Sequence, residues 1–441
     1  MKMLFYAARC APGGFNTFIQ TMYRSLGSIG IDAECYFERD EGGYQELSTL
    51  CRAHLGTVIS LKSVLGTSKC EVIQTTLSSV DNGVLARKLR NIAWSGKVVV
   101  TAQGVVLPGW NSKNCFALTS VNRRQALELE SMTDLKVDTI YNGVDTSLFS
   151  PSEYVGGAPI IAWVGRASDL PQKRFDLFAL MVPHLKARGI RVWIADPEGC
   201  ASVSASLREA ILPHVELWKS VPRDRMPDFY RRVSESGGCV VSTTRYEGLS
   251  FALIEAQACG CPVVAATAVG VDESVRSEHG GVLYPPEITA TELCDLVSTV
   301  ISAKQAMAER REMCRRFIVD NFSQDGIAKH YAELYSRRSQ TFSFDVKDRR
   351  LVSERARLIL STMNNPLYSF REDLAAVRSA TTLDPSLTRR PHVWRKVATS
   401  ILKLWVFAAI GCLKDFRTNA LRLRNGRGRR AHRSEQVDSR R

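Results

Sequence analysis

Two glutamates, Glu247 and Glu255, lie eight positions apart in the segment STTRYEGLSFALIEAQACGCPVV, which begins at Ser242. A helical stretch is predicted after Glu247, because apolar residues recur there at helical spacing: Leu249, Ala252, Leu253 and Ala256. Glu255 then lies two turns further along. Two carboxylates held near one helix start could accept hydrogen bonds from the hydroxyl groups of a bound sugar.

The backbone around the predicted helix start also favours a ligand. Gly248 permits a sharp turn beside it, and the unpaired N–H groups of Leu249 and Ser250 would attract an anion such as a diphosphate. A β-branched strand, 239–244, precedes the turn, and Gly260 closes the helix before the next strand. The alternative is an ordinary strand-helix-strand unit with an exposed glutamate at each end. Because the rest of the chain repeats the same theme in order, the sequence favours a binding site.

This segment resembles the signature of the family-4 retaining glycosyltransferases, also described as glycosyl transferases group 1. The first Glu precedes a Gly-hydrophobe pair, the second lies in Glu-Ala, and a Gly-x-Pro-Val strand follows. The resemblance implies the GT-B fold, in which a nucleotide sugar binds between two Rossmann-like halves. It also implies that Glu255 holds the donor ribose hydroxyls and that Glu247 contacts the transferred sugar.

Two basic residues match the same family further upstream. The stretch IIAWVGRASDLPQKRF, 160–175, predicts a strand followed by a loop with Arg166 and Lys173. The resemblance implies that both cations neutralise the donor phosphates, and departure of a nucleoside diphosphate develops negative charge that fixed cations stabilise. A solvated basic loop is the alternative. The family's usual Gly after this lysine is Arg174 here, which weakens the loop geometry but keeps the charge.

Two cleft positions are predicted in the first half of the chain. Gly13 and Gly14 lie between a first strand and a first helix, resemble the family's Gly-rich loop, and let backbone N–H groups approach a phosphate or the acceptor. Gln103 follows a strand where many relatives carry His, and it is a predicted contact of the acceptor or the sugar. Glutamine keeps hydrogen-bond capacity but carries no proton at neutral pH. Either the reaction uses no imidazole here, with the leaving phosphate as base, or the site is less efficient.

The composition and motifs of the chain restrict which cofactors it could use and in which cellular compartment it would fold. No Asp-x-Asp pair is present, so we expect no metal and no other cofactor beyond the donor substrate itself. The twelve cysteines include no Cys-x-x-Cys pair and lie mostly in apolar runs, which predicts packed thiols in a reducing cytoplasm rather than disulfides or zinc. The apolar run after Lys2 is interrupted by Arg9, so no secretory signal is predicted.

Short β-branched strands alternate with helical patterns, which predicts an α/β chain of two doubly wound, Rossmann-like domains that face a cleft. We expect an acceptor-side domain over 1–145, a nucleotide-sugar domain over 146–322, and a crossover helix over 323–338. The crossover helix would bury Ile327, Tyr331 and Leu334 on one face. The resemblance covers about residues 1–338.

The remaining residues, 339–441, form a basic tail. From 341 onward the tail holds 22 Lys and Arg against 9 Asp and Glu, a net +13 of the chain's +14. Its apolar segment 398–413 contains Lys403 and is shorter than the roughly 20 residues that span a bilayer. An interfacial helix on an acidic membrane surface fits it. A helix packed on the catalytic domains is the alternative, and no nucleic-acid partner is expected because no aromatic residues interleave the arginines.

Two functions therefore remain open. The first is a retaining, metal-independent glycosyltransferase that moves a sugar from a nucleotide donor to a saccharide or lipid-linked saccharide hydroxyl, in cell-surface polysaccharide or glycolipid synthesis. It would act in the cytoplasm, at the inner membrane face. The second is a catalytically inactive GT-B subunit that binds a nucleotide sugar or serves as a scaffold. Gln103 and Arg174 keep the second open, whereas Arg166, Lys173 and both glutamates favour the first.

Overall fold

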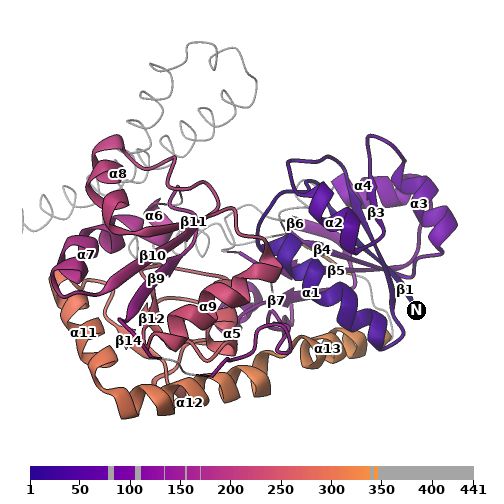
Figure 1. Ribbon diagram of the computed structural model, residues 1–441. Coiled ribbons are helices and arrows are strands. Elements are labelled where there is room, and N and C mark those ends of the chain that lie inside the picture. Colours follow the sequence, from indigo (N-terminus) through magenta and orange to yellow (C-terminus); the bar gives the residue numbers. More distant parts are fainter. Residues whose placement is uncertain are drawn as a thin grey trace, which may run out of the picture. The chain divides into compact units, whose positions relative to one another are not determined.

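Seven parallel strands form the first sheet of the part of the chain that the structure describes, in the order β3-β2-β1-β4-β5-β7-β8 (Figure 1). Its central strands, β1 (Lys2–Ala7), β4 (Val72–Thr76) and β5 (Lys97–Ala102), are buried almost throughout. The mostly apolar sequences of β1 and β5 suit this burial, whereas β4 buries the polar residues Gln74, Thr75 and Thr76. The outer strands are β2 (Asp32–Phe37), β3 (Ala53–Leu55), β7 (Ala117–Ser120) and β8 (Asp138–Thr139). The helices of this domain are α1 (Gly14–Ser28), α2 (Tyr44–Leu50), α3 (Leu61–Ser68), α4 (Val84–Asn91) and α5 (Arg123–Thr133).

The second sheet is also parallel and has the order β11-β10-β9-β12-β13-β14. Its strands are β9 (Ile160–Val164), β10 (Arg191–Asp196), β11 (Glu216–Lys219), β12 (Cys239–Ser242), β13 (Val263–Ala266) and β14 (Val282–Tyr284). The helices are α6 (Leu170–Lys173), α7 (Phe175–Ala187), α8 (Ala205–Ile211), α9 (Met226–Glu235), α10 (Phe251–Ala258), α11 (Ala290–Ser302) and α12 (Lys304–Phe322).

Strand order reverses once beside the first strand of each sheet. The reversal falls between β1 and β4 in the first sheet and between β9 and β12 in the second. This is the order of a doubly wound Rossmann-like domain, whose ligands bind beyond the carboxyl ends of the strands at the reversal. The predicted pair of doubly wound α/β domains is confirmed.

The chain passes between the domains twice, and the two passages are hydrogen-bonded to each other. Val144 pairs with Ser323 in a short parallel bridge, and the Val144 N–H donates to the Phe322 carbonyl at 2.8 Å. Helix α13 (Gln324–Ser336) then returns to the first domain after α12, as the orange ribbon of Figure 1 shows. Its buried side chains join the core around β1 and α1, and they include the predicted face of Ile327, Tyr331 and Leu334.

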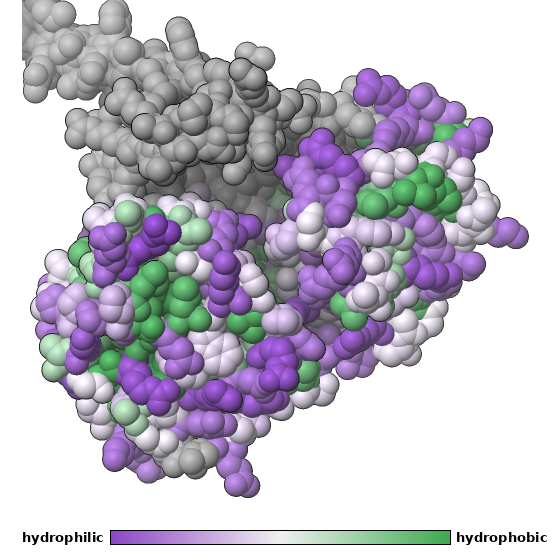
Figure 2. Space-filling view, turned by 45° about the horizontal axis from the view of Figure 1, so that its top comes forward, coloured by the Kyte–Doolittle hydropathy of each residue, from purple (hydrophilic) through white to green (hydrophobic). Residues whose placement is uncertain are grey.

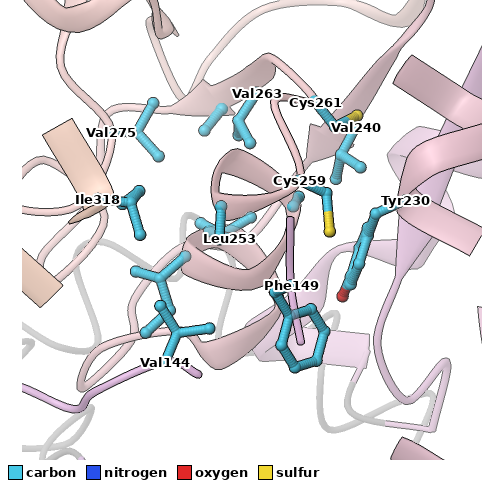
Figure 3. Close-up of a cluster of buried hydrophobic side chains, with 14 of the residues drawn as sticks. Val144, Phe149, Tyr230, Val240, Leu253, Cys259, Cys261, Val263, Val275 and Ile318 are labelled. Carbon is cyan, nitrogen blue, oxygen red and sulfur yellow. The ribbon is translucent and has the colours of Figure 1, made fainter. Parts of the chain in front are cut away.

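The second domain's core explains the cysteines beside Gly260. Helix α10 ends at Cys259, and Gly260 follows with φ +66°, a left-handed conformation that suits glycine. Figure 3 shows Cys259 and Cys261 within the apolar cluster that contains Val240 and Val263. All eleven cysteines of the described residues are buried and none is in a disulfide, so they pack as small hydrophobes.

The computed structural model describes residues 1–77, 84–104, 111–133, 135–153, 156–168, 170–337 and 342–345. The chain divides into two compact units, Met1–Met363 and Asn364–Arg441, and every described residue belongs to the first. The predicted apolar segment 398–413 lies outside the described residues. Residues 342–345 form β15 (Phe342–Asp345), which pairs antiparallel with β6 (Asn111–Cys115).

The surface of the described residues is mostly hydrophilic on the face that Figure 2 shows, with hydrophobic residues in smaller patches. No helix among the described residues is long and apolar enough to cross a membrane.

Candidate active site

A cavity of about 920 Å³ lies at the carboxyl ends of both sheets. The first domain lines it with residues that follow β1, β4 and β5, and the second with residues that follow β9, β10 and β12. The cavity thus touches the reversal point of each sheet, where ligands of doubly wound domains bind. Nine of the ten predicted site residues line it: Gly13, Gly14, Gln103, Arg166, Lys173, Glu247, Gly248, Leu249 and Ser250.

Glu247 and Lys173 form an ion pair on the cavity wall. The Lys173 ammonium donates to Glu247 Oε1, and the Thr244 hydroxyl donates to the same oxygen at 3.3 Å. The two side chains are 11% and 19% exposed, so the pair faces the cavity without lying free in solvent. The Glu247 N–H donates to the Val269 carbonyl at 2.8 Å, which fixes the backbone beneath the carboxylate. A cation and a carboxylate are therefore presented together to any ligand.

Arg166 approaches the Gly-rich loop of the first domain. Gly13 has φ +146°, and a Cβ at this position would lie 3.8 Å from Arg166 Nη1. Gly13 is also the N-cap of α1 and provides no side-chain cap, so the cap leaves first-turn N–H groups at the cavity edge. The positive guanidinium and these N–H donors together provide an environment that suits an anion.

The start of α10 differs from the sequence prediction. The helix begins at Phe251, so Leu249 and Ser250 precede its first turn and Glu247 lies in the loop before it. The physical reason is that this loop bonds to the first domain: Asn122 Nδ2 donates to the Gly248 carbonyl at 2.6 Å, and Asn142 Nδ2 donates to the Leu249 carbonyl at 3.2 Å. The first-turn N–H groups of α10 are therefore those from Phe251 onward, and Phe251 and Ala252 also line the cavity. Anion binding at this helix start stays a prediction.

Glu255 is the predicted site residue that does not line the cavity. It lies inside α10 and is 6% exposed, and its Oε1 accepts from Arg223 Nη2 at 3.0 Å and Nε at 3.3 Å. Burial raises the pKa of Glu255, and the Arg223 charge acts against that rise. Arg223 also donates to the Thr21 hydroxyl of α1 at 2.9 Å, so this pair reaches the first domain. The ribose role that the resemblance implies for Glu255 stays a prediction.

Gly248 touches Gln103 across the two domains. A Cβ at Gly248 would lie 2.0 Å from the Gln103 carbonyl oxygen, which no real side chain permits. Glycine is thus required at this position by the close approach of the two backbones. In the described part of the chain, the buried Gln103 Nε2 has no hydrogen-bond partner, although Gln103 lines the cavity. A buried donor without a partner favours a ligand acceptor at this point.

Three further residues form hydrogen bonds between the two domains and were missed from the sequence. Besides Asn122 and Asn142, Glu273 accepts from the Arg123 and Arg124 N–H groups at 2.8 and 3.1 Å and so caps α5 from the other domain. Tyr141 donates to the same Glu273 carboxylate at 3.0 Å, and burial together with this carboxylate raises the pKa of Tyr141 to about 12.

A local signal was present only for Asn122. It directly precedes α5 at the N-cap position, and its Oδ1 accepts from the Gln125 N–H at 2.6 Å. That signal identifies the start of a helix, but it does not identify Gly248 as the partner of the Asn122 amide, since the two residues are 126 positions apart.

Arg174 shows how the departure from the family pattern is accommodated. It adopts φ 48° and ψ 47°, the left-handed region that the family's usual Gly would occupy easily. Its guanidinium bonds weakly to Asp176 and the Pro286 carbonyl, both at 3.5 Å, and does not line the cavity. Arg174 therefore adopts the backbone conformation that suits glycine, and its charge lies outside the cavity lining.

The described residues contain no group of three or more His, Cys, Asp or Glu side chains arranged to hold a metal ion. Metal independence itself stays a prediction, because a metal could also enter with the substrate.

Known proteins resemble this chain in both sequence and fold. Residues 158–303 match the family Glycosyl transferases group 1. The D-inositol 3-phosphate glycosyltransferase of Segniliparus rotundus is 26% identical over 250 residues, which cover 51% of this chain and 52% of that protein. The enzyme of the same name from Mycolicibacterium smegmatis is 29% identical over 209 residues, 44% of this chain and 46% of that protein. The chain spans about half the length of these curated relatives.

Solved structures of the same fold match this chain over nearly the whole of their own length. Alr3699/HepE from Anabaena, in complex with UDP, has a TM-score of 0.61 at 17% identity and covers 76% of this chain and 100% of its own. Sucrose-phosphate synthase from Thermosynechococcus elongatus has a TM-score of 0.62 at 16% identity and covers 76% and 98%. The architecture is thus GT-B, with two Rossmann-like domains. In sequence, residues 158–303 of the second domain are similar to the group 1 glycosyltransferases.

Proposed function

We propose that this chain is a retaining glycosyltransferase that transfers a sugar from a nucleoside-diphosphate sugar to a saccharide hydroxyl. One observation carries the proposal. Arg166, Lys173 and Glu247 of the second domain line the same cavity as Gly13, Gly14 and Gln103 of the first. That arrangement supplies cations for a diphosphate, a carboxylate for a sugar hydroxyl, and an open side on which an acceptor can enter.

The diphosphate is assigned to the cations of the second domain. Arg166 can hold two phosphate oxygens at once, and the N–H groups at the start of α1 face the same anion. Lys173 lines the same cavity and pairs with Glu247, whose carboxylate keeps the ammonium in place before the donor arrives. Negative charge that develops on the leaving diphosphate then meets cations that need not move.

The transfer breaks the bond between the anomeric carbon and the diphosphate oxygen and forms one to the acceptor oxygen on the same face of the sugar. The acceptor proton passes to the departing phosphate, since Gln103 cannot accept it. Glu247 holds a hydroxyl of the transferred sugar, and Gln103 Nε2 donates to the sugar or the acceptor. The reaction requires no metal ion in this scheme, because Arg166 and Lys173 supply the positive charge.

The comparisons suggest probes for the donor and the acceptor. Because Alr3699/HepE is described in complex with UDP, a uridine diphosphate sugar is our first candidate donor. The curated relatives are named for a sugar-like polyol, D-inositol 3-phosphate, and we propose a saccharide or lipid-linked saccharide hydroxyl as acceptor. The basic tail would hold the enzyme at an acidic membrane surface on the cytoplasmic side, where polysaccharide or glycolipid precursors are extended.

Ligand binding and turnover separate this proposal from the inactive-subunit alternative. Melting temperature is measured with UDP, GDP and ADP, because a ligand that binds the folded state alone raises it. Turnover is then followed as release of the free diphosphate from the matching nucleotide sugar, and proton NMR of the transferred sugar reports whether the anomeric configuration is kept. Binding without turnover or transfer would identify a nucleotide-sugar-binding subunit instead.

Variants and chelation test the charge roles. Arg166→Ala should weaken diphosphate binding more than Lys173→Ala, because a guanidinium grips two oxygens. Lys186→Ala, whose ammonium bonds to His214 on the surface, is the matched control and should bind normally. Activity should survive EDTA. Loss on chelation with recovery in Mg²⁺ or Mn²⁺ would show that the phosphate site was wrongly assigned.

A further inference from the structure

A pair of thiols lies away from the proposed active site, between β2 and the end of α2. Cys35 Sγ in β2 and Cys51 Sγ directly after α2 are 3.3 Å apart. The backbones are already joined here, because the Cys35 N–H donates to the Arg52 carbonyl at 2.8 Å. Figure 1 labels α2 and β3, the two elements on either side of Cys51, in the indigo to violet first domain. Closing the sulfur atoms to a disulfide distance of about 2.05 Å therefore requires a small side-chain movement.

The two thiols differ in access. Cys51 is 8% exposed and lines a surface pocket of about 510 Å³ together with Tyr44, Arg52 and His54. Cys35 is fully buried behind it. A small molecule that enters this pocket reaches the Cys51 sulfur first and can reach Cys35 only through it.

The two thiols differ in acidity as well. The hydrogen bond with Cys35 lowers the pKa of Cys51 against the opposing effect of burial, whereas burial raises the pKa of Cys35. The nearby Cys10 is fully buried, and burial raises its pKa to about 12. Because the thiolate is the reactive form, Cys51 is the favoured nucleophile of this group.

We propose that Cys51 and Cys35 form an oxidation site, in which a small peroxide converts the two thiols to a disulfide. The Cys51 thiolate attacks one peroxide oxygen, the O–O bond breaks, and a sulfenic acid and one water form after proton uptake. Cys35 sulfur then attacks Cys51 sulfur, the S–O bond breaks, and the departing oxygen leaves as a second water with the Cys35 proton. Two thiols and one hydrogen peroxide thus give one disulfide and two waters, with the peroxide reduced.

The bond would constrain the edge of the acceptor-side domain. It would tie the residue after α2 to β2 and close a loop from Cys35 to Cys51. A cross-link that closes a loop in the unfolded chain raises the melting temperature when it fits the folded geometry. Oxidation should therefore stabilise this domain rather than unfold it.

The sequence allows a direct test by mass spectrometry. Trypsin releases Cys10, Cys35 and Cys51 on three separate peptides, 10–24, 25–39 and 40–52, each with a single cysteine. The full chain is treated with hydrogen peroxide, alkylated while folded, and digested without reduction. We expect peptides 25–39 and 40–52 to be joined, two hydrogens lighter than their sum, while Cys10 stays unjoined. Melting temperature should rise with the appearance of this product and fall back on reduction.

Serine variants separate the roles of the two sulfurs. In Cys35→Ser, peroxide should leave a Cys51 sulfenic acid that dimedone traps, and in Cys51→Ser the Cys35 peptide should stay unmodified. The proposal is overturned if the wild-type peptides stay separate, if Cys51 joins Cys10 instead, or if the bond forms only in denaturant. None of these outcomes bears on nucleotide binding or transfer, so this site and the proposed function fail or stand independently.

Discussion

The two glutamates of the 242–275 segment have opposite surroundings in the structure. Glu247 lies in a loop, faces the cavity, and pairs with a lysine that also lines it. Glu255 lies inside a helix, away from the cavity wall, and pairs with Arg223 in a buried contact. Similar residues in one short segment thus differ in access, because the chain changes from loop to helix at Phe251 between them.

The comparison teaches that the partner of each carboxylate decides what it can do. The Lys173 partner of Glu247 can turn to a ligand, since both side chains reach the cavity. The Arg223 partner of Glu255 is more constrained: its guanidinium lies over the Phe149 and Phe251 rings, at 5.6 and 5.8 Å, and donates to Thr21 of the first domain. For Glu255 to bind a ribose, Arg223 must share or release its carboxylate.

The largest expected effect concerns the buried pair. Glu255→Ala leaves the Arg223 charge without its carboxylate in a buried site, which should lower the free energy of unfolding by about 3 kcal/mol or more. Glu247→Ala should cost under about 1 kcal/mol, because Lys173 can still reach solvent in the cavity. Urea unfolding of both variants measures the difference.

The same two variants should reverse their order in catalysis. We expect Glu247→Ala to keep diphosphate binding and to lose most transfer, because its carboxylate faces the cavity in which we propose that the reacting sugar binds. Calorimetry measures the affinity of the folded fraction of Glu255→Ala for a free nucleoside diphosphate and so tests whether Glu255 binds the ribose. Equal affinity for this variant and the wild type would remove Glu255 from the donor site, and similar unfolding curves for both alanine variants would contradict the structural contrast.

The second effect concerns the residue next to Glu247. Gly248→Ala places a Cβ where the Gln103 carbonyl already lies, so the loop or the first domain must shift. Overpacking of this kind costs about 1 to 3 kcal/mol. Gly66→Ala is the control: it lies in α3 with open space at the Cβ position and should be neutral or stabilising. A Gly248→Ala variant with wild-type melting temperature and transfer rate would show that this contact does not hold the site.

Much of this arrangement was predictable from the sequence where the cause is local. The β-branched run 239–244 predicted β12 (Cys239–Ser242) to within two residues of its end, and the Gly260 signal ended α10 correctly. The nine cavity residues were predicted from motifs that the resemblance specified and, for Gly248, Leu249 and Ser250, from the turn and helix start next to Glu247. All of these signals lie within a few residues of the feature that they identify.

The remaining features depend on contacts between distant parts of the chain. The start of α10 was placed too early, because apolar spacing does not report that Asn122 and Asn142 bind the preceding loop. The partner of Glu255 could not be found either, since Arg223 lies 32 residues away in a different element. Glu273 likewise acts on α5 at a separation of 150 residues.

A third effect tests the contact between Glu273 of the second domain and the start of α5 in the first. Glu273→Ala removes the carboxylate that accepts the Arg123 and Arg124 N–H groups, and loss of a helix cap costs about 1 kcal/mol. Hydrogen exchange at these two amides should accelerate, while exchange within α11 stays unchanged. Glu278→Ala is the control, because its exposed carboxylate only approaches Arg276 at 3.6 Å. Unchanged exchange at Arg123 and Arg124 would show that the cap does not form in solution.

The smallest effect concerns Arg174, the neighbour of the lysine that pairs with Glu247. Arg174→Gly and Arg174→Ala both remove the weak contacts to Asp176 and Pro286, but only glycine adopts the left-handed conformation of φ 48° without a Cβ clash. The left-handed conformation costs alanine more than glycine loses through its greater freedom in the unfolded chain. The glycine variant should therefore be more stable than the alanine variant by about 1 kcal/mol. Thermal unfolding of the two variants at one pH gives this difference. A more stable alanine variant would mean that residue 174 leaves the left-handed region in solution, and that Lys173 is presented to Glu247 by a different loop.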